Sequence, residues 1–450
     1  MSLLKRLSEN QQIMQTSSSQ SQDRPKGKDE KKVQEPNLKV KLQKYLVDEI
    51  QKQSDDLNDE QTKDLIQNVA NSFFEKEGER LTFEAKQEIV HSITNELIGY
   101  GPITPFLNDG DISEIMVNGP NQVYVEKKGQ LIVTDAYFRN NEHVLQVIEK
   151  IVAPLGRRID ESSPMVDARL PDGSRVNAII PPLALNGPSI TIRKFPQNRL
   201  QIKNLIVFGT LSEEMAMFLE GCVKARLNIF ISGGTGSGKT TLLNILSSFI
   251  PFDERIITIE DAAELQLSQD HVVSLETKPP NIEGKGEITI RDLVRNSLRM
   301  RPDRVVIGEV RSAEALDMLQ AMNTGHDGSL ATGHSNSPRD MLARIETMVL
   351  MAGIDLPVRA IREQISGAID LIVQQSRLKD GSRKITHISE VIGMEGETII
   401  LQDIFIFKQT RITDNGKIEG KYVSTGIRPS CTDKLERYGI DVPAEWFREE

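Results

Sequence analysis

Cysteine is almost missing from this sequence, which has only Cys222 and Cys431 among its 450 residues. The two cysteines match no metal-ligand spacing, so no structural zinc is expected. In a reducing compartment both side chains would stay as thiols. Disulfides and cysteine-bound metals are therefore not expected to hold this fold together.

Long apolar runs are missing too. No stretch approaches the ~18–20 consecutive apolar residues that a membrane-spanning helix needs. The segment Met1–Leu7 is apolar over too short a distance for a secretory signal, and polar sequence follows it. We therefore expect a cytoplasmic protein. Residues 3–7 could provide at most a marginal apolar face for contact with a membrane surface.

An excess of positive charge is also missing, since the formal net charge is −10 and the isoelectric point lies near 5.4. A protein whose whole surface binds nucleic acid would carry the opposite balance. We therefore expect no direct nucleic-acid partner, although a local basic channel is compatible with this composition.

What the chain does contain is enough length for two or three domains, with 38% apolar and 27% charged residues. Residues 1–36 predict a disordered arm, because their polar composition cannot bury enough apolar surface. Residues 37–98 predict a small helical bundle, because apolar residues recur there at every fourth position. These apolar residues are Leu42, Leu46, Ile50, Leu65, Val69, Phe73, Ile89, Ile93 and Leu97.

Residues 99–195 change to short strands with Gly and Asn turns, and they predict an α+β domain with one helix at about residues 142–152. The expected strands are Ile112–Val117, Val123–Glu126, Leu131–Thr134, Met165–Leu170, Arg175–Ile180 and Ser189–Lys194. The pattern alone does not determine how these strands connect. A linker over residues 196–211 is expected to follow.

Residues 212–450 alternate strands with helices, which predicts an α/β domain built on a mostly parallel, doubly wound sheet. The expected strands are Leu227–Ser232, Arg255–Glu260, Arg304–Ile307 and Ser329–Thr332, with later strands near Ile369–Gln375, Ile385–Met394 and Glu397–Phe405. The expected helices are Thr240–Phe249, Ile290–Arg299, Ala313–Asn323, Asp340–Met351 and Val358–Ser366. The tail after Phe407 shows no pattern that we can map.

A glycine-rich segment between the first of these strands and its helix matches the complete P-loop pattern. Its glycines let the backbone turn tightly, so that N–H groups point at phosphate oxygens together with the helix N-terminus. Lys239 is expected to bridge the outer phosphates of ATP, and the Thr240 hydroxyl is expected to bind Mg²⁺. The predicted nucleotide-binding residues are Gly233, Gly234, Thr235, Gly236, Ser237, Gly238, Lys239, Thr240 and Thr241.

Two later strands end in carboxylates, at Glu260 and at Glu309. Acids at the carboxyl edge of such a sheet hold Mg²⁺ through water or orient an attacking water molecule. Glu309 fits the Mg²⁺ role, and either acid could orient the water. His326 and His334 flank another strand, where a neutral imidazole could report the state of the nucleotide by hydrogen bonding.

With these elements in order, the chain resembles the type II/IV secretion ATPases, and within them the CpaF/TadA branch that powers tight-adherence (Flp-type) pilus assembly. Besides the P-loop, the similarity rests on an acidic box ending in Glu260, an atypical Walker B element ending in Glu309, and a histidine box. It also rests on the segments Ala225–Thr240, Thr277–Gly286, Leu298–Arg304 and Leu356–Gln364. The tetracysteine zinc motif of many type II secretion motors is absent from the sequence.

The resemblance implies a homohexameric ring in which a sensor-like domain is joined by a mobile linker to a RecA-like motor. It implies that Glu309 serves Mg²⁺, that Glu260 is the catalytic base and that His334 senses phosphate. Arginines of the N-terminal domain reach the nucleotide in that family. Arg175 and Arg193 fit this role best, and Arg169 fits it less well.

The implied partner is an inner-membrane platform of a pilus or secretion machine, to which a cytoplasmic ATPase would bind peripherally. Two alternatives stay open. One is a type IV secretion motor that moves DNA or protein effectors, and the other is a nucleotide-gated scaffold with negligible turnover.

Overall fold

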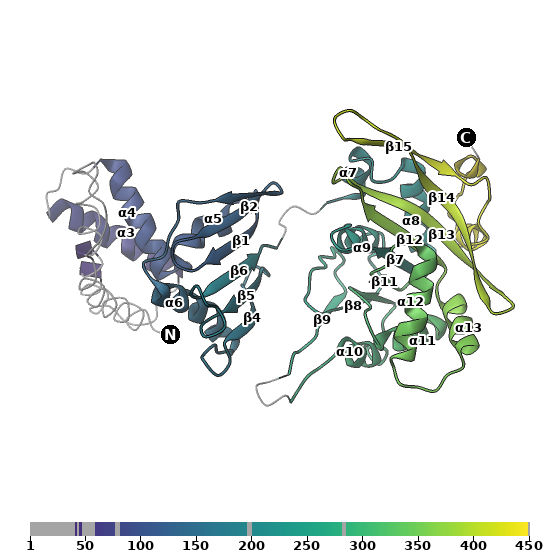
Figure 1. Cartoon of the computed structure of the whole chain (residues 1–450), viewed down its shortest axis with the longest axis horizontal. Helices are drawn as coiled ribbons and strands as arrows, with labels where there is room; N and C mark the ends of the chain where they lie inside the picture. Colours follow the sequence, from purple (N-terminus) through teal and green to yellow (C-terminus); the bar gives the residue numbers. More distant parts are fainter. Residues whose placement is uncertain are drawn as a thin grey trace. The chain divides into compact units, whose positions relative to one another are not determined.

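The computed structural model describes residues 41–42, 45–46, 59–76, 82–195, 200–280 and 285–448. The chain divides into two compact units, Met1–Gln197 and Asn198–Glu450, shown in Figure 1. The predicted arm, residues 1–36, lies outside the described residues. Within those residues, no helix is long and apolar enough to cross a membrane.

The first unit begins with helical segments whose apolar stripes pack together. Helices α3 (Asp59–Lys76) and α4 (Phe83–Leu97) carry the predicted stripes, and Thr82 caps α4 by accepting a hydrogen bond from the Ala85 N–H. Leu42 and Leu46 lie in helical residues and are fully buried against these helices. The described apolar residues of this segment therefore form one small core, and the predicted Ile50 lies outside the described residues.

The second part of this unit is an antiparallel sheet with α6 (Asn141–Val152) packed on one face. The strand order is β3-β2-β1-β6-β5-β4. The strands are β1 (Ile112–Asn118), β2 (Val123–Lys127), β3 (Gln130–Val133), β4 (Met165–Arg169), β5 (Arg175–Ile179) and β6 (Ser189–Arg193). Along β6, Ile190 and Ile192 are buried and their neighbours are more exposed, so the opposite face of the sheet carries the polar side chains.

The second unit is built on a nine-stranded sheet in the order β15-β14-β13-β12-β7-β11-β10-β8-β9. Strands from β12 to β9 in this order pair in parallel, and β13, β14 and β15 add antiparallel pairs at one side. The strands are β7 (Ile229–Gly233), β8 (Ile256–Glu260), β9 (Val272–Glu276), β10 (Arg304–Ile307), β11 (Leu330–Gly333), β12 (Leu371–Arg377), β13 (Arg383–Glu395), β14 (Thr398–Ile412) and β15 (Ile418–Ser424).

Helices cover both faces of this sheet and form two separate cores (Figure 1). One face carries α8 (Glu213–Lys224), α9 (Lys239–Ser247) and α14 (Thr432–Arg437). The other face carries α10 (Ile290–Ser297), α11 (Glu314–Asn323), α12 (Pro338–Leu350) and α13 (Val358–Ala368). This arrangement confirms the predicted α/β class and a RecA-like motor domain.

The structure also shows elements that the sequence did not reveal. Residues 202–207 of the predicted linker form α7 (Ile202–Val207), and Leu205 is buried in the core of the second unit. The tail after Phe407 extends β14, adds β15 and then returns to this core. Its anchor is the buried Glu390, whose carboxylate accepts hydrogen bonds from the N–H groups of Ser430 and Cys431 at 3.0 and 2.6 Å. The tail is therefore part of the motor.

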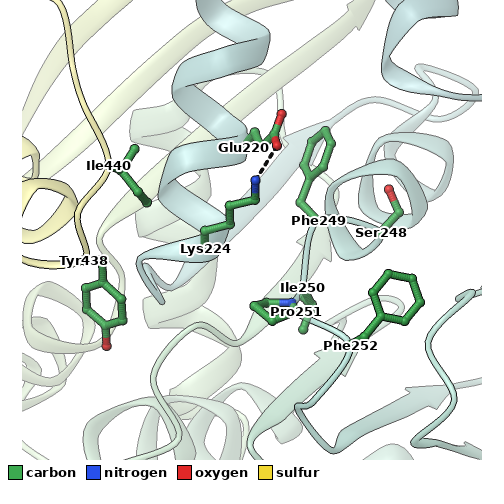
Figure 2. Close-up of a pocket in the computed structure, with 9 residues that line it drawn as sticks. All are labelled: Glu220, Lys224, Ser248, Phe249, Ile250, Pro251, Phe252, Tyr438 and Ile440. Atoms are coloured by element: carbon green, nitrogen blue, oxygen red, sulfur yellow. Dashed lines mark hydrogen bonds and ion pairs between the residues drawn. The ribbon is translucent and has the colours of Figure 1, made fainter.

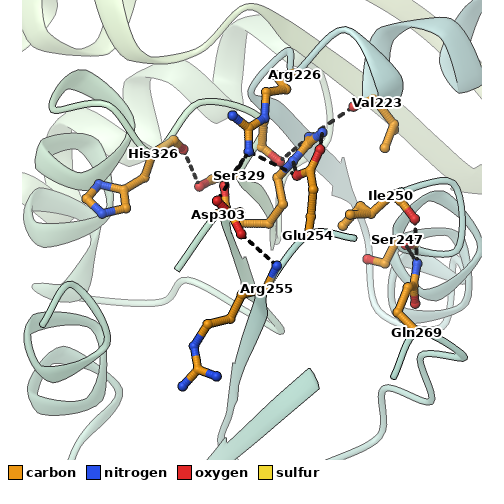
Figure 3. Close-up of polar contacts among 12 residues, drawn as sticks. Val223, Arg226, Ser247, Ile250, Glu254, Arg255, Gln269, Asp303, His326 and Ser329 are labelled. Carbon is orange, nitrogen blue, oxygen red and sulfur yellow. Dashed lines mark hydrogen bonds and ion pairs between the residues drawn. The ribbon is translucent and has the colours of Figure 1, made fainter. Parts of the chain in front are cut away.

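A buried ion-pair network lies at the amino edge of the parallel strands, around Arg304 at the start of β10. Arg304 is 0% exposed, and its Nη2 donates to Glu254 Oε1 at 3.1 Å. Its Nη1 donates to the carbonyl oxygens of Val223 at 2.9 Å and Gly328 at 3.1 Å. Figure 3 shows Arg226 on the same Glu254, 3.1 Å away. The guanidinium thus joins α8, β10 and the segment before β11.

Removing Arg304 should destabilise the second unit, because Glu254 would lose its main buried partner. We expect Arg304→Met to lower the free energy of unfolding by about 3 kcal/mol. The measurement is a urea titration followed by circular dichroism, with the exposed Arg299→Met as matched control. Adding Glu254→Gln should restore part of the loss, and an unchanged unfolding midpoint in Arg304→Met would contradict this assignment.

Candidate functional site

The glycine-rich loop follows β7 and leads into α9, which begins at Lys239. Gly236 and Gly238 have φ angles of 69° and 102°, a backbone region that favours glycine. A Cβ atom on Gly233 would lie only 2.2 Å from the carbonyl oxygen of Gln375 on the neighbouring β12. The loop conformation therefore depends on glycine at these positions, as the P-loop prediction requires.

Several buried polar atoms around this loop have no hydrogen-bond partner within the described part of the chain. They are Ser232 Oγ, Ser237 Oγ, Gln374 Oε1 and Gln375 Oε1. Buried polar groups are nearly always satisfied, so such a group of orphaned atoms is typical of a site that binds a polar ligand. All of them lie at the carboxyl ends of β7 and β12, beside the loop or within it.

A chain of charged and polar side chains runs from this loop across the carboxyl edge of the sheet. Lys239 is 7% exposed, and its Nζ donates to the Gly234 carbonyl at 3.0 Å and lies 3.4 Å from His334 Nδ1. His334 Nε2 lies 2.7 Å from Glu309 Oε1. Arg311 Nη2 bonds the other oxygen of Glu309 at 2.6 Å. Strands β7, β11 and β10 are neighbours, and their carboxyl ends place these residues together.

The electrostatics of this chain favour a neutral His334. Burial lowers the pKa of its imidazole, and the Lys239 ammonium lowers that pKa further, while Glu309 pulls in the opposite direction. A neutral ring can turn the Nδ1 lone pair toward Lys239. Its Nε2 lies close to Glu309 Oε1, which has no hydrogen-bond partner among the described residues. Burial likewise lowers the pKa of Lys239, although the nearby Glu309 raises it.

Glu260 ends β8, which lies beside β10 in the sheet. It is 3% exposed, and its Oε1 accepts hydrogen bonds from the N–H groups of Glu264 at 2.9 Å and Leu265 at 3.1 Å. A Cβ atom on Gly308 would lie 2.8 Å from the Glu260 Cγ, so glycine leaves room for this carboxylate. Glu260 therefore shapes the turn after β8, and its role as catalytic base stays a prediction.

The predicted arginines of the first unit form a row across its sheet. Arg169 pairs with Arg175, Arg175 with Arg193, and Arg193 with Glu114 on adjacent strands. Directly opposed residues project from the same face of a sheet. The Arg193 side chain is 67% exposed, and its Nε lies 3.9 Å from Glu114 Oε1. The structure thus brings all three predicted arginines to one edge of one face, and their contact with nucleotide stays a proposal.

His326 lies apart from the other predicted site residues of its subunit. It precedes β11, whereas His334 follows the carboxyl end of the same strand. Figure 3 shows His326 beside Ser329, whose hydroxyl donates to the His326 carbonyl at 2.8 Å. Since β11 runs parallel to β7, His326 lies at the edge of the sheet opposite the P-loop. Within one subunit it cannot contact the nucleotide that the P-loop would hold.

Sequence reasoning missed Arg311 and Gln375 as members of the site. Arg311 follows Glu309 by two residues and also lies 3.3 Å from Asp261, so a search for charged residues near each acid could have found it. Gln375 lies under the P-loop only because β12 pairs with β7. No local pattern in the sequence predicts that pairing.

A separate cavity of ≈ 440 Å³ lies at the far end of α9, where Ser248–Phe252 follow the helix (Figure 2). The figure shows Tyr438 and Ile440 of the tail facing this segment, with the ion pair of Lys224 and Glu220 between them. Because α9 begins at the P-loop and ends here, its length separates the two places. The cavity does not belong to the P-loop site.

Oxygen ligands for a magnesium ion are present at the P-loop. The Thr240 hydroxyl and the Glu309 carboxylate fit the preference of Mg²⁺ for oxygen atoms and for water-mediated contacts. Among the described residues, no group of three or more His, Cys, Asp or Glu side chains is arranged to hold a metal ion by itself. Phosphate oxygens would have to complete the coordination of Mg²⁺ here.

Known proteins are similar to this chain over much of its length. The family model described as "Type II/IV secretion system protein" matches residues 96–397. A putative conjugal transfer protein of Mycobacterium tuberculosis is 35% identical over 310 residues, which are 68% of this chain and 88% of that protein. The type IV secretion system protein VirB11 of Bartonella henselae is 32% identical in an alignment of 345 positions, gaps included, that covers 66% of this chain and 95% of that protein.

A solved structure, the VirB11 ATPase from the Brucella suis type IV secretion system in complex with sulphate, is 30% identical. The match covers 64% of this chain and 92% of that one, with a TM-score of 0.36. The family model alone spans more than half of the sequence, from the first unit into the hairpin of β13 and β14. The chain therefore belongs to the type II/IV secretion system protein family.

Proposed function

We propose that this protein hydrolyses ATP and converts the energy into mechanical work for a secretion or pilus-assembly machine. The observation that carries the proposal is the chain of side chains from Lys239 through His334 and Glu309 to Arg311, beside a P-loop with orphaned polar atoms. Mg²⁺ held by Thr240 and, through water, by Glu309 would neutralise charge on the phosphates.

The residues of this chain would act in distinct ways. Lys239 would exchange its contacts with the Gly234 carbonyl and His334 for phosphate oxygens. His334, no longer in contact with Lys239, would then respond to phosphate and pass the change to Glu309, which it contacts. Arg311 holds the other oxygen of Glu309 and so keeps that carboxylate oriented. Glu260 would position the attacking water from the neighbouring strand.

At the level of the machine, we propose a homohexamer of the CpaF/TadA branch that works at an inner-membrane platform. The segments Thr277–Gly286 and Leu356–Gln364 support this branch. A type IV secretion motor for DNA or effectors is the second candidate, and the names of the conjugal transfer and VirB11 relatives favour it. Deleting the gene separates these two functions. Loss of surface pili would indicate pilus assembly, and loss of DNA transfer would indicate a type IV secretion motor.

The proposed activity is tested by phosphate release from the purified full chain with ATP and Mg²⁺. Turnover above the background of a Lys239→Ala preparation supports the proposal. ATP binding without phosphate release, at any protein concentration, would favour the nucleotide-gated scaffold instead.

A further inference from the structure

Two arginines border the P-loop on the side away from the catalytic acids. Arg377 ends β12 and Arg383 begins β13, and the two residues pair directly across these strands. Arg383 Nε donates to the Gly236 carbonyl at 3.2 Å. A Cβ atom on Gly236 would lie 4.0 Å from Arg377 Nη1, and one on Gly238 would lie 3.3 Å from Arg383 Cδ. Both side chains thus reach the outer rim of the loop.

Among the described residues, no acidic side chain balances the charges of this pair. Both side chains are exposed, and neither forms an ion pair with an acid in the parts of the chain that the structure describes. Asp380, in the turn between them, is engaged elsewhere, because it accepts hydrogen bonds from Ser382 Oγ at 2.6 Å and the Ile418 N–H at 2.8 Å. Like charges opposite each other on paired strands are destabilising, which favours an anion between them.

A buried polar group points to a ligand at the same place. Gln375 is 2% exposed and its Oε1 has no hydrogen-bond partner among the described residues. Its Nε2 lies 3.1 Å from the position that a Cβ atom on Gly238 would take. Gln375 lies two residues before Arg377 on β12, so the amide and the guanidinium project from the same face of that strand.

The sheet order indicates which end of a nucleotide would lie here. His334, Glu309 and Glu260 follow β11, β10 and β8, which all lie on one side of β7. These residues mark the end of the nucleotide where the terminal phosphate is cleaved. Strands β12 and β13 lie on the other side of β7, so the opposite end of the nucleotide would extend over them.

We propose that Arg377 and Arg383 bind the α-phosphate and the adjoining nucleoside of the nucleotide, and so set its affinity without taking part in the cleavage of the terminal phosphate. This inference rests on the proposed ATPase function. A guanidinium suits the site because it can bond a phosphate oxygen and also stack on a base or cover a ribose. A contact with the α-phosphate stabilises ground state and transition state equally, so it affects binding and not the chemical step.

The experiment compares Arg377→Ala and Arg383→Gln with wild type in the full chain. Arg377 makes no hydrogen bond to the loop that the structure records, and glutamine keeps a donor at position 383. We expect the KM for ATP and the Kd for fluorescent ADP to rise about tenfold in each variant, as loss of a charge-assisted hydrogen bond implies. We expect kcat to stay within about twofold of wild type.

Arg411→Ala is the matched control, because Arg411 is an exposed arginine on β14 whose partner is Glu419. It should change none of these constants. A fall in kcat with unchanged KM would overturn the proposal, since it would place the arginines at the terminal phosphate or in the shaping of the loop. Unchanged KM, Kd and kcat would overturn it in favour of another anionic ligand. A wild-type protein that neither binds nor hydrolyses ATP would instead refute the proposed function itself.

Discussion

Lys239→Ala should weaken nucleotide binding as well as turnover, whereas Glu309→Gln should lower turnover and leave binding largely intact. Lys239 is buried at the start of α9, with its ammonium facing a loop carbonyl and His334. It is therefore placed to bond phosphates directly. Glu309 contacts His334 and Arg311, and it would reach the nucleotide through Mg²⁺ and water. The two variants separate these roles.

The expected loss of rate is about 10²–10³ for each variant, as for the removal of one preorganised group from a desolvated site. Affinity is measured with a labelled ATP analogue, and rate by phosphate release from the same preparation. Glutamine has the shape of glutamate, so the fold should survive, and thermal melting verifies this. Lys408→Ala, which removes an exposed lysine of β14, is the control for a general effect of lost charge. Wild-type turnover in Glu309→Gln would exclude Glu309 from the site.

Sequence patterns that involve only neighbouring residues were sufficient to predict the main elements of the second unit. The P-loop, the acid after β10 and the alternation of strands and helices depend on local spacing, and the structure places Lys239 and Glu309 in one chain of contacts. His326 shows where such local patterns end, because the structure places it apart from the P-loop of its own subunit. Two residues on either side of a strand seem close in the sequence, but the strand carries them to opposite edges of the sheet.

The residues that were missed depend on pairing between distant segments. Gln375 and Arg383 lie at the P-loop because β12 adds to β7 and β13 adds to β12, well over a hundred residues later in the chain. The packing of the tail could not be predicted from the sequence either. Phe447 packs against Phe218 and Phe405 with ring centroids 5.8 Å apart in both pairs, and nothing near Phe447 in the sequence indicates these partners.

Catalysis should also need the first unit, through the arginines of its sheet. Lys239 is the cation within the P-loop. A second cation is generally needed to stabilise the charge that spreads over the transferred phosphoryl group. Arg311 is occupied by Glu309 and Asp261. Arg193 is largely exposed, and its long contact with Glu114 contributes little to stability. An arginine of this kind can be worth ~10³–10⁵ in rate.

We therefore expect Arg193→Ala to lower kcat strongly while affinity for ATP changes little, and Arg175→Ala to act in the same direction. A fragment that begins at Leu200, and so keeps α7 with the second unit, should bind ATP and hydrolyse it poorly. Arg158→Ala is the matched control, because Arg158 is an exposed arginine of the same unit, paired with Asp160. Equal turnover in Arg193→Ala and wild type would remove this arginine from the mechanism.

If Arg193 acts on the nucleotide of a neighbouring subunit, catalysis requires an assembled ring. Specific activity should then rise steeply with protein concentration, as light scattering and a coupled ATPase assay can show together. Mixing Lys239→Ala with Arg193→Ala subunits decides between the two geometries. A mixed ring contains sites with an intact P-loop beside an intact arginine from the next subunit, so activity should reappear only if the arginine acts in trans. Closure of the first unit on bound ATP, and its release after hydrolysis, would then couple each turnover to a movement between subunits. A fully active monomer would contradict this coupling, because a single subunit has no neighbour to supply the arginine.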